Sequence, residues 1–457
     1  MKVGNGDLGP KPLKFTMPTY LIHFAQFHME FRLPELDSLA ILEAVELRYD
    51  PAAYSNDSPF MLVEIPNDDD ARKLVKRSIL VKHIVRLWAE SPTLEDILET
   101  IKDARELHAP YLKSSFKFIV AAFGYTIELD EQISRIERFS FLPFEGPIDL
   151  KNPDVTFAYY EDYGKPSAQE GAVREANKPK RVFFGVLLAS GNRGVVTTYD
   201  LKKRKYLGTT SMDAELSLVM ANQALVRLGS FVLDPFVGTG SFLMTCAHFG
   251  AFTMGADIDG RQIRGKDRRN IQSNAVQYGL TGRVLDNVVC DLAHHPWRIQ
   301  PVWDAIVCDP PYGVRAGAKK IGNNPKIKPP PTVLKSNGEP RYPQTVPYEM
   351  NDVIVDLIDF AATFLVPGGR LVYWLPTVTD EYVPEDVPIH PKFKLVANSE
   401  QNFGKWARRL ITMEKLRGDE ELVGVDLERG AEPATAVPAH SKFRTKYFEC
   451  VRGVENL

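Results

Sequence analysis

Two short segments of this chain carry residue types and spacings that could do chemistry. The first, 234-DPFVGTGS-241, is a glycine-rich turn that follows an apolar run. The second, 304-DAIVCDPPYG-313, is an apolar run that ends in an aspartate, two prolines and a tyrosine. Glycines let a ligand approach the backbone closely, and a double proline makes a stiff turn without backbone donors. We interpret the segments as two halves of one site.

The glycine turn would be the half that binds a cofactor. Gly238 and Gly240 permit close approach, and the amino terminus of the helix that follows favours an anionic group, here the carboxylate of a methionine moiety. The turn lacks the third glycine of the dinucleotide fingerprint, and Asp234 with Pro235 precedes it. These features favour S-adenosylmethionine over a dinucleotide, with Asp234 at the cofactor. Tight packing between strand and helix is the alternative.

Further carboxylates follow the next strand-like runs. Asp257 lies 23 residues after Asp234, and a carboxylate there can accept hydrogen bonds from both ribose hydroxyls. Asp259 is expected to cap the next helix. Asp291 is placed to meet an adenine amino group, and the alternative is an acid in a surface turn.

Asp309 opens the half of the site that would hold a reacting amine. An amine on an aromatic ring is a poor nucleophile because its lone pair is delocalised into the ring. The Asp309 carboxylate and the Pro310 carbonyl can both accept amine hydrogens, which would turn the lone pair toward a methyl donor. Tyr312 offers a flat face on which a base can stack, and positioning would supply most of the acceleration. A simple proline-rich turn is the alternative.

The elements that must position these residues follow two patterns. From about residue 210, apolar runs alternate with helical stretches, and the early runs end at carboxylates. This predicts an α/β Rossmann-like domain, a doubly wound and mostly parallel sheet that binds ligands at the carboxyl ends of its strands. The preceding chain mixes short helices and strands in an α+β pattern. There, 181-RVFFGVLLA-189 and 195-VVTTYDL-201 predict a hairpin.

These patterns divide the chain into an N-terminal module at 1–180, a Rossmann-like domain at 181–416 and a flexible tail at 417–457. The domain contains a proline-rich insertion at 314–345 with seven Lys or Arg residues and one Glu. It is either a disordered insertion or a lid that contacts phosphates. The same two interpretations apply to 202-KKRK-205.

Composition limits the class of protein. The 457 residues carry a net charge of −3, so a nucleic-acid partner must be argued from local patches. The four cysteines form no C-x-x-C pair, so we expect neither a disulfide framework nor a metal site, and a reducing compartment. No apolar run reaches the length of about 18 residues that spans a membrane. A cytosolic or nuclear protein is expected.

Together, the two motifs resemble those of Rossmann-like amino-methyltransferases. The block 204-RKYLGTTSMDAELSLVMANQALV-226 narrows the resemblance. It is similar to the catalytic subunits of the tRNA guanine-10 methyltransferase family, most strongly over 181–375. The N-terminal region resembles, more weakly, the ferredoxin-like plus THUMP module with which that family binds tRNA.

The resemblance implies a reaction and partners. The reaction would move a methyl group from S-adenosylmethionine to the 2-amino group of guanosine at tRNA position 10, giving N2-methylguanosine. The protein would be cytoplasmic and would form a heterodimer with a small zinc-binding activator. Matching the family motifs assigns the cofactor to Gly238, Gly240, Asp257 and Asp291, the base to Asp309 and Tyr312, and the surroundings of the methionine end to Thr210, Ser211 and Asp213.

Other functions remain open at this point. Within the class, the acceptor could be adenine or cytosine in DNA or a protein glutamine, although glutamine enzymes usually carry Asn where this chain has Asp309. A catalytically inert RNA-binding scaffold is disfavoured by the intact Asp309 and Tyr312. A dinucleotide oxidoreductase is disfavoured by the missing third glycine.

Overall fold

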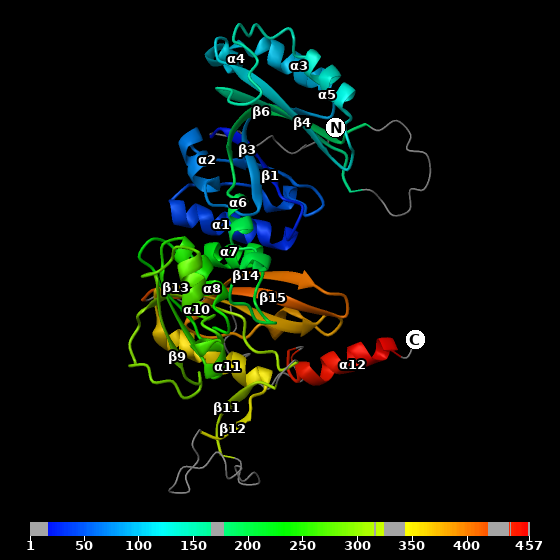
Figure 1. Cartoon of the computed structure of the whole chain (residues 1–457). Coiled ribbons are helices and arrows are strands. Elements are labelled where there is room, and N and C mark those ends of the chain that lie inside the picture. The colour runs from blue at the N-terminus through cyan, green and yellow to red at the C-terminus, as the bar shows by residue number, and fades with distance from the viewer. Residues whose placement is uncertain are drawn as a thin grey trace, which may run out of the picture. The chain divides into compact units, whose positions relative to one another are not determined.

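The chain forms two compact units, which Figure 1 colours along the sequence. The computed structural model describes residues 17–165, 178–314, 317–323, 343–418, 438 and 440–455. The first unit comprises Met1–Met29 and Glu43–Asn192, and the second Glu30–Leu42 and Arg193–Leu457. The short segment Glu30–Leu42 is therefore part of the second unit, although its neighbours in sequence belong to the first.

The first unit contains a six-stranded sheet of order β2-β1-β3-β6-β5-β4. Its strand pairs are antiparallel except β4 with β5, which is parallel. The strands are β1 (Thr19–Phe24), β2 (Phe60–Glu64), β3 (Val81–Ser91), β4 (Phe116–Phe123), β5 (Val155–Asp162) and β6 (Arg181–Ser190). The helices are α2 (Asp68–Val75), α3 (Leu94–Asp103), α4 (Arg105–His108) and α5 (Leu129–Glu137). This mixture confirms the predicted α+β class.

The sequence patterns placed the end of the first module at residue 180, but the first unit extends to Asn192 and includes strand β6. This strand pairs with both β3 and β5, so it is a central strand of the first sheet and cannot begin the next domain. The prediction of a hairpin that continues through 195–201 was wrong, because this stretch contains the helix α6 (Gly194–Thr198). Val195 is buried there, and such packing outweighs the strand preference of β-branched residues.

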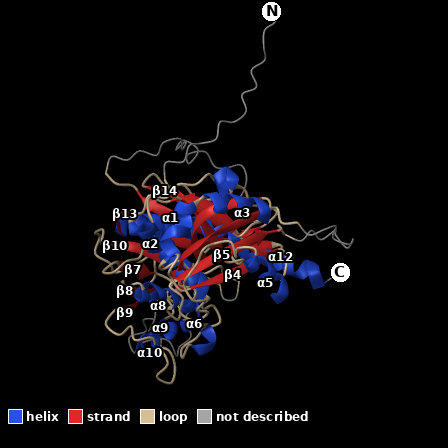
Figure 2. Cartoon of the chain, turned by 90° about the horizontal axis from the view of Figure 1, so that it is seen from above, coloured by secondary structure: helices blue, strands red, loops and turns tan. Residues whose placement is uncertain are grey.

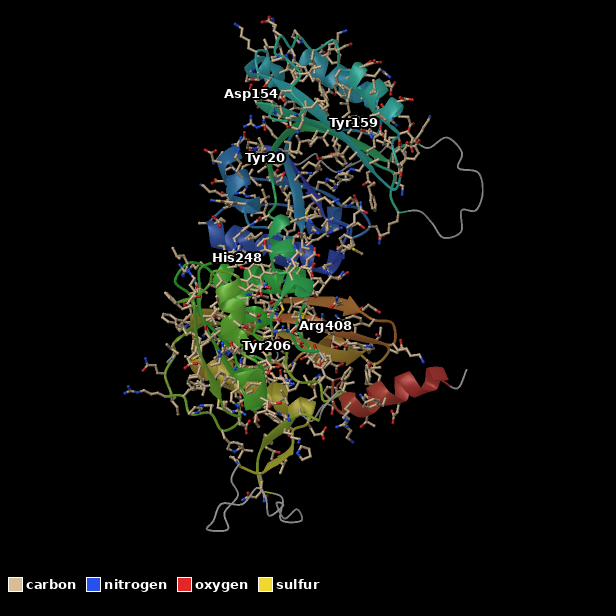
Figure 3. All side chains as sticks on the ribbon, in the orientation of Figure 1. Tyr20, Asp154, Tyr159, Tyr206, His248 and Arg408 are labelled. Carbon is tan, nitrogen blue, oxygen red and sulfur yellow. The ribbon has the colours of Figure 1, made fainter. Side chains whose placement is uncertain are left out.

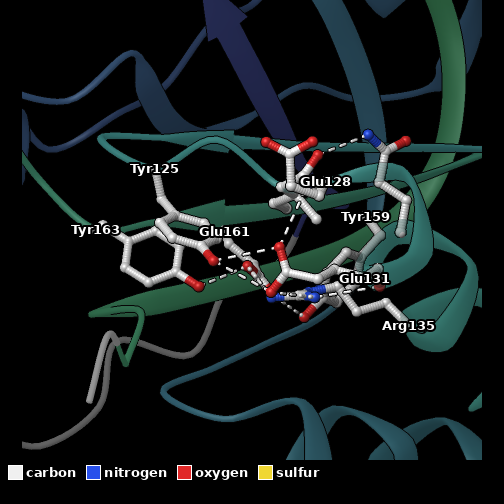
Figure 4. A network of polar contacts seen from close by, with 9 residues as sticks. Tyr125, Glu128, Glu131, Arg135, Tyr159, Glu161 and Tyr163 are labelled. Atoms are coloured by element: carbon white, nitrogen blue, oxygen red, sulfur yellow. Dashed lines mark hydrogen bonds and ion pairs between the residues drawn. The ribbon is translucent and has the colours of Figure 1, made fainter.

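A buried carboxylate ties α5 to β5 in the first unit (Figure 4). Arg135 Nε donates to Glu161 Oε1 at 2.7 Å, and the Tyr159 hydroxyl donates to the same oxygen at 2.7 Å. The Tyr163 hydroxyl donates to Glu161 Oε2 at 2.8 Å. Glu161 is only 3% exposed, so these donors rather than water satisfy its oxygen atoms.

The second unit contains a seven-stranded sheet of order β14-β15-β13-β10-β7-β8-β9. Strands β13, β10, β7, β8 and β9 run parallel, whereas β15 is antiparallel to both β13 and β14. The strands are β7 (Phe231–Asp234), β8 (Phe252–Asp257), β9 (Val284–Val289), β10 (Trp303–Cys308), β13 (Leu365–Val378), β14 (Phe393–Asn402) and β15 (Trp406–Lys415). The predicted doubly wound, mostly parallel sheet is confirmed.

The second unit also contains helices, and Figure 2 draws the helices of the chain in blue and its strands in red. The helices of the second unit are α1 (Arg32–Glu43), α6, α7 (Ala214–Gln223), α8 (Ser241–His248), α9 (Gly260–Arg264), α10 (Ile271–Gln277), α11 (Met350–Phe364) and α12 (Phe443–Glu455). The core between α11 and the sheet includes Ile306, Leu357 and Leu371, all fully buried. Among the described residues, no helix is both long and apolar enough to cross a membrane.

Two stretches for which the sequence analysis predicted no helix or strand contain such elements. Strands β11 (Lys319–Ile321) and β12 (Thr345–Pro347) pair at the two ends of the basic insertion. The middle of that insertion, 324–342, lies outside the described residues. Helix α12 lies in the segment 417–457 that we expected to be a flexible tail, of which 419–437 also lies outside the described residues.

The order of the strands brings the two motifs together. Strands β8 and β9 lie on one side of β7, whereas β10 and β13 lie on the other, so the direction of winding reverses between β7 and β10. Val232 pairs with Ala305 and Leu233 with Ile306 in parallel register. The loops after Asp234 and after Cys308 therefore leave the sheet as neighbours, at the switch point where open α/β sheets bind ligands.

Candidate active site

The glycine turn needs its glycines for backbone conformation. Gly238 has φ of 49° and Gly240 has φ of 80°, both in the left-handed region that disfavours side chains. Gly240 directly precedes helix α8, and a Cβ there would lie 3.1 Å from Ile271 Cγ2. A Cβ at Gly238 would meet nothing nearer than the Phe236 carbonyl oxygen at 4.0 Å. The turn thus faces open space at Gly238.

Asp257 joins the end of β8 to this turn. Its Oδ2 accepts from the Gly238 backbone N at 2.9 Å, and its Oδ1 accepts from the Asp259 backbone N at 2.8 Å. Burial raises the pKa of Asp257, although these two hydrogen bonds lower it in part. Each oxygen can accept a second hydrogen bond, as contact with a ribose would require. Asp259 caps α9 as predicted, accepting from the Arg261 backbone N at 3.0 Å.

Asp234 supports the turn from within the protein. It is 1% exposed, and its Oδ1 accepts from the Phe236 backbone N at 3.0 Å. Burial raises its pKa well above the usual range, and the charges of Asp257 and Asp309 raise it further. Three carboxyl groups thus lie at the carboxyl ends of the neighbouring strands β8, β7 and β10. The observed contact of Asp234 is with the turn's backbone.

The block before α7 also reaches the turn. Ser211 Oγ forms a hydrogen bond of 2.7 Å with Thr239 Oγ1 and accepts from the Gly208 backbone N at 3.0 Å. Asp213 caps α7 by accepting from the Leu216 backbone N at 2.9 Å. Ser211 thus lies beside the glycine turn, whereas the contact observed for Asp213 is that of a helix cap.

Asp291 is a buried acid, not a residue of a surface turn. It is 2% exposed, and its Oδ2 accepts from the Ile321 backbone N at 2.7 Å. His294 Nδ1 lies 2.9 Å from the same oxygen, and Oδ1 accepts from the Ala293 backbone N at 3.2 Å. Asp291 therefore anchors strand β11 of the insertion at the end of β9.

Asp309 and Tyr312 contact each other directly at the end of β10. The Tyr312 hydroxyl donates to Asp309 Oδ1 at 2.5 Å, and Pro310 between them is buried. Burial raises the pKa of Asp309 to about 6, while the charge of Arg408 and the hydrogen bond from Tyr312 both lower it. The carboxyl group is thus poised to change charge just below neutral pH.

Two arginines at the site were missed by the sequence analysis. Arg204, in the basic cluster 202–205, is buried and donates from Nη1 to Ser241 Oγ at 2.8 Å and from Nη2 to the Gly240 carbonyl at 3.2 Å. It holds the glycine turn, which neither interpretation of the cluster anticipated. Arg408 comes from β15 (Figure 3), about 100 residues after the motif that it faces, and no local pattern marks it.

Two protein-family models match this chain. The model for the Tmrp11 THUMP N-terminal domain matches residues 18–193. The model for the RMKL-like methyltransferase domain matches residues 202–324. The boundary between the matched regions agrees with the division between the two units at residue 192.

Curated relatives match this chain over nearly its full length, and two of them illustrate the match. The tRNA (guanine(10)-N(2))-methyltransferase of Schizosaccharomyces pombe is 40% identical over 467 residues, which cover 94% of this chain and 96% of that protein. The tRNA (guanine(10)-N(2))-methyltransferase TRMT11 of Homo sapiens is 38% identical over 455 residues, covering 96% and 97%. Among solved structures, TrmN from Thermus thermophilus matches with 20% identity and a TM-score of 0.42, covering 87% of this chain and 100% of that chain.

Proposed function

Because this chain belongs to the tRNA (guanine(10)-N(2))-methyltransferase family, we propose that it methylates the 2-amino group of guanosine at position 10 of tRNA, with S-adenosylmethionine as the methyl donor. The observation that carries the residue assignment is the adjacency of the two motifs. The glycine turn after β7 and the Asp309–Tyr312 pair after β10 leave neighbouring parallel strands. A donor at the first motif and an amine at the second would meet between them.

The residues around the glycine turn fit this donor. The space beside Gly238 is open, and the amino terminus of α8 favours a carboxylate such as that of a methionine moiety. Asp257 presents two oxygens that can each accept another hydrogen bond, which suits a ribose diol. Ser211 and Thr239 offer hydroxyls beside the same turn. The bound donor would supply a methyl group on a positively charged sulfur.

Asp309 and Pro310 would prepare the amine. In its ionised form Asp309 accepts amine hydrogens through its carboxylate oxygens, and the Pro310 carbonyl can accept another. This draws the nitrogen lone pair out of conjugation with the ring. As the nitrogen forms its bond to the methyl group, the sulfur–methyl bond breaks and its electrons stay on the sulfur, which becomes a neutral thioether. The nitrogen is then cationic and loses one proton to Asp309 or to water. The Tyr312 ring would support the base, and its hydroxyl would move from Asp309 Oδ1 or share that oxygen with the amine.

The test is methyl transfer from labelled donor to total tRNA, followed by nucleoside analysis of the product. We expect N2-methylguanosine at position 10 and its loss in Asp309→Ala, with donor affinity measured by calorimetry nearly unchanged. Methylation of another base or atom would refute the proposed substrate. Full turnover by Asp309→Ala would refute the proposed role of Asp309.

The N-terminal unit is proposed to bind the tRNA. Residues 18–193 match a THUMP N-terminal domain model, and such a module fits a substrate much larger than one nucleoside. We expect tRNA protection by the chain to include nucleotides distant from position 10. A footprint confined to the nucleotides next to the methylated base would contradict this proposal.

A small zinc-binding activator is the proposed partner, in the cytoplasm. The partner is an expectation from family resemblance, and the compartment also agrees with Cys246, Cys290 and Cys308 being free thiols. Co-expression with the activator should give a 1:1 complex on size exclusion and raise turnover. Equal turnover by the purified chain alone would exclude an activator requirement.

A further inference from the structure

Arg408 is held in place by three side chains from its own part of the sheet. Its guanidinium carbon lies 4.1 Å from the centre of the Trp374 ring and 5.7 Å from that of Phe403. Its Nε donates to Gln401 Oε1 at 2.7 Å. A planar cation that stacks on tryptophan and is fixed by a hydrogen bond has little freedom to move. This arrangement orients the remaining nitrogen atoms.

The strand register brings this cation to the end of β10. Arg408 lies opposite Pro376 of β13, and β13 in turn pairs with β10 through Tyr373 and Cys308. Asp309 follows Cys308 immediately. Arg408 is close enough for its charge to lower the pKa of Asp309 and of Tyr312. A residue from the antiparallel part of the sheet thus faces the proposed base site.

Burial opposes the negative charge of Asp309. The carboxyl group of Asp234 and the thiol of Cys308 also interact electrostatically with Asp309, and neither of them is a cation. Tyr312 donates one hydrogen bond. Burial raises the pKa of Asp309 to about 6, and Arg408 is the charged group that lowers it. An amine acceptor that must be ionised at neutral pH needs this opposing charge.

We propose that Arg408 is a positioning residue for methyl transfer: stacked on Trp374, it holds the Asp309 carboxylate ionised and aligned with Tyr312 when the base enters. This proposal rests on the proposed role of Asp309 as the acceptor for the amine. It assigns a function in the reaction to the β13–β15 part of the sheet, which contains neither recognised motif.

The experiment measures kcat between pH 5.5 and 9.5 with the full-length protein, together with its activator if one is required. Arg408→Met removes the charge but keeps an aliphatic chain that can pack on Trp374. Arg408→Lys keeps the charge. Arg409→Met is the matched control, because Arg409 is the next residue of β15, lies 3.5 Å from the centre of the Tyr382 ring and pairs with Glu400 instead.

Loss of the charge should move the acidic limb of the kcat profile to higher pH. We expect a shift of at least one unit in Arg408→Met, and at pH 7 a shift of one unit lowers kcat about twofold and a shift of two units about tenfold. The rate should recover toward the wild-type plateau near pH 9. Arg408→Lys should return the acidic limb most of the way to its wild-type pH, and Arg409→Met should keep the wild-type profile.

Other outcomes would overturn the proposal in distinguishable ways. A uniform loss of rate in Arg408→Met without a shift of the limb would mean that Arg408 only supports the fold, and an unchanged profile would mean that it has no role. If Arg408→Met fails to bind donor in calorimetry, Arg408→Gln takes its place as the neutral variant. A limb displaced as far in Arg408→Lys as in Arg408→Gln then refutes the role of the charge. A wild-type profile without an acidic limb, or with the same limb in Asp309→Asn, would instead refute the role of Asp309.

Discussion

At the scale of single residues, Tyr312 has two separable roles. Its hydroxyl donates to Asp309 and lowers the pKa of that carboxyl group, while its ring offers a face for the base. Tyr312→Phe should therefore raise the pKa of Asp309 above about 6. Because the ionised carboxylate is the active form, activity is lost as pH falls through this pKa. The acidic limb of kcat should move to higher pH with little change in the plateau.

Removing the ring should have a different effect. Stacking of a base on an aromatic side chain contributes about 1–3 kcal/mol, so Tyr312→Ala should lower kcat/KM by roughly tenfold to a hundredfold at every pH. Rate measurements on one tRNA transcript with both variants separate the roles. Identical profiles for Tyr312→Phe and Tyr312→Ala would show that the hydroxyl and the ring do not act separately.

Asp257 and Asp259 offer a matched pair for testing the cofactor half. Asp257→Ala removes the acceptor for the Gly238 backbone N and the proposed acceptor for the ribose. We expect the dissociation constant for S-adenosylmethionine to rise at least tenfold, about 1.4 kcal/mol. Asp259→Ala removes the cap of α9 and the ion pair of Asp259 with the exposed Arg261, so affinity should change less than about twofold by calorimetry. Equal effects of the two substitutions on affinity would contradict the proposal that Asp257 binds the cofactor.

At the scale of elements, the buried Glu161 should determine whether α5 stays on β5. Glu161→Ala leaves the partly buried Arg135 without its main anionic partner, and it leaves the hydroxyls of Tyr159 and Tyr163 without their acceptor. Breaking one side of a buried ion pair costs about 3–5 kcal/mol. Hydrogen exchange in β5 and α5 should speed up by the corresponding factor. A local measurement is needed because a chain of two units need not unfold in one step.

The control is a solvent-exposed ion pair in the same unit. Glu95 pairs with Arg138 at 3.2 Å, with side chains 65% and 48% exposed. Such pairs contribute at most about 1 kcal/mol, so Glu95→Ala should leave the exchange of β5 nearly unchanged. If Glu161→Ala behaved like Glu95→Ala, the network in Figure 4 would not hold α5 in place.

The sequence patterns predicted most of the second sheet because its central strands are short apolar runs that end at carboxylates. They did not predict β15, whose residues Arg408 and Arg409 interrupt the apolar run. They also misassigned 195–201, where local strand preference gave way to burial of Val195 in α6. Asp234, Asp257, Asp291 and Asp309 could be placed from local patterns. Arg204 and Arg408 could not, because only tertiary packing brings them to the motifs.

At the scale of the whole molecule, the two units are not two consecutive stretches of the sequence. Helix α1 is preceded and followed in sequence by the first unit, but its segment belongs to the second. Asn222 Nδ2 donates to Glu35 Oε1 at 2.7 Å, and Arg370 Nη1 donates to Ser38 Oγ at 3.1 Å, all among buried residues. Pairs separated by 187 and 332 residues leave no local signal in the sequence.

This arrangement predicts how the chain tolerates truncation. A fragment that begins at residue 193 lacks α1, so Asn222 loses its buried partner Glu35 and Arg370 loses Ser38, while the Phe31 ring no longer packs beside Trp374. The loss of each intramolecular hydrogen bond costs about 0.5–1.5 kcal/mol, and the apolar surface that α1 covers becomes exposed as well. The fragment should therefore lose donor binding, as measured by calorimetry, through loss of its fold.

An internal excision should behave differently from that truncation. If residues 43–192 are replaced by a flexible Gly-Ser linker, the segment Glu30–Leu42 remains with Arg193–Leu457 and the second unit keeps all of its parts. We expect this variant to bind S-adenosylmethionine with an affinity within about threefold of the full chain, and to lose tRNA binding if the first unit supplies it. Equal donor binding by the fragment that begins at residue 193 would show that α1 is dispensable. Loss of donor binding by the excised variant, with its fold intact by circular dichroism, would show that the first unit contributes to the cofactor site.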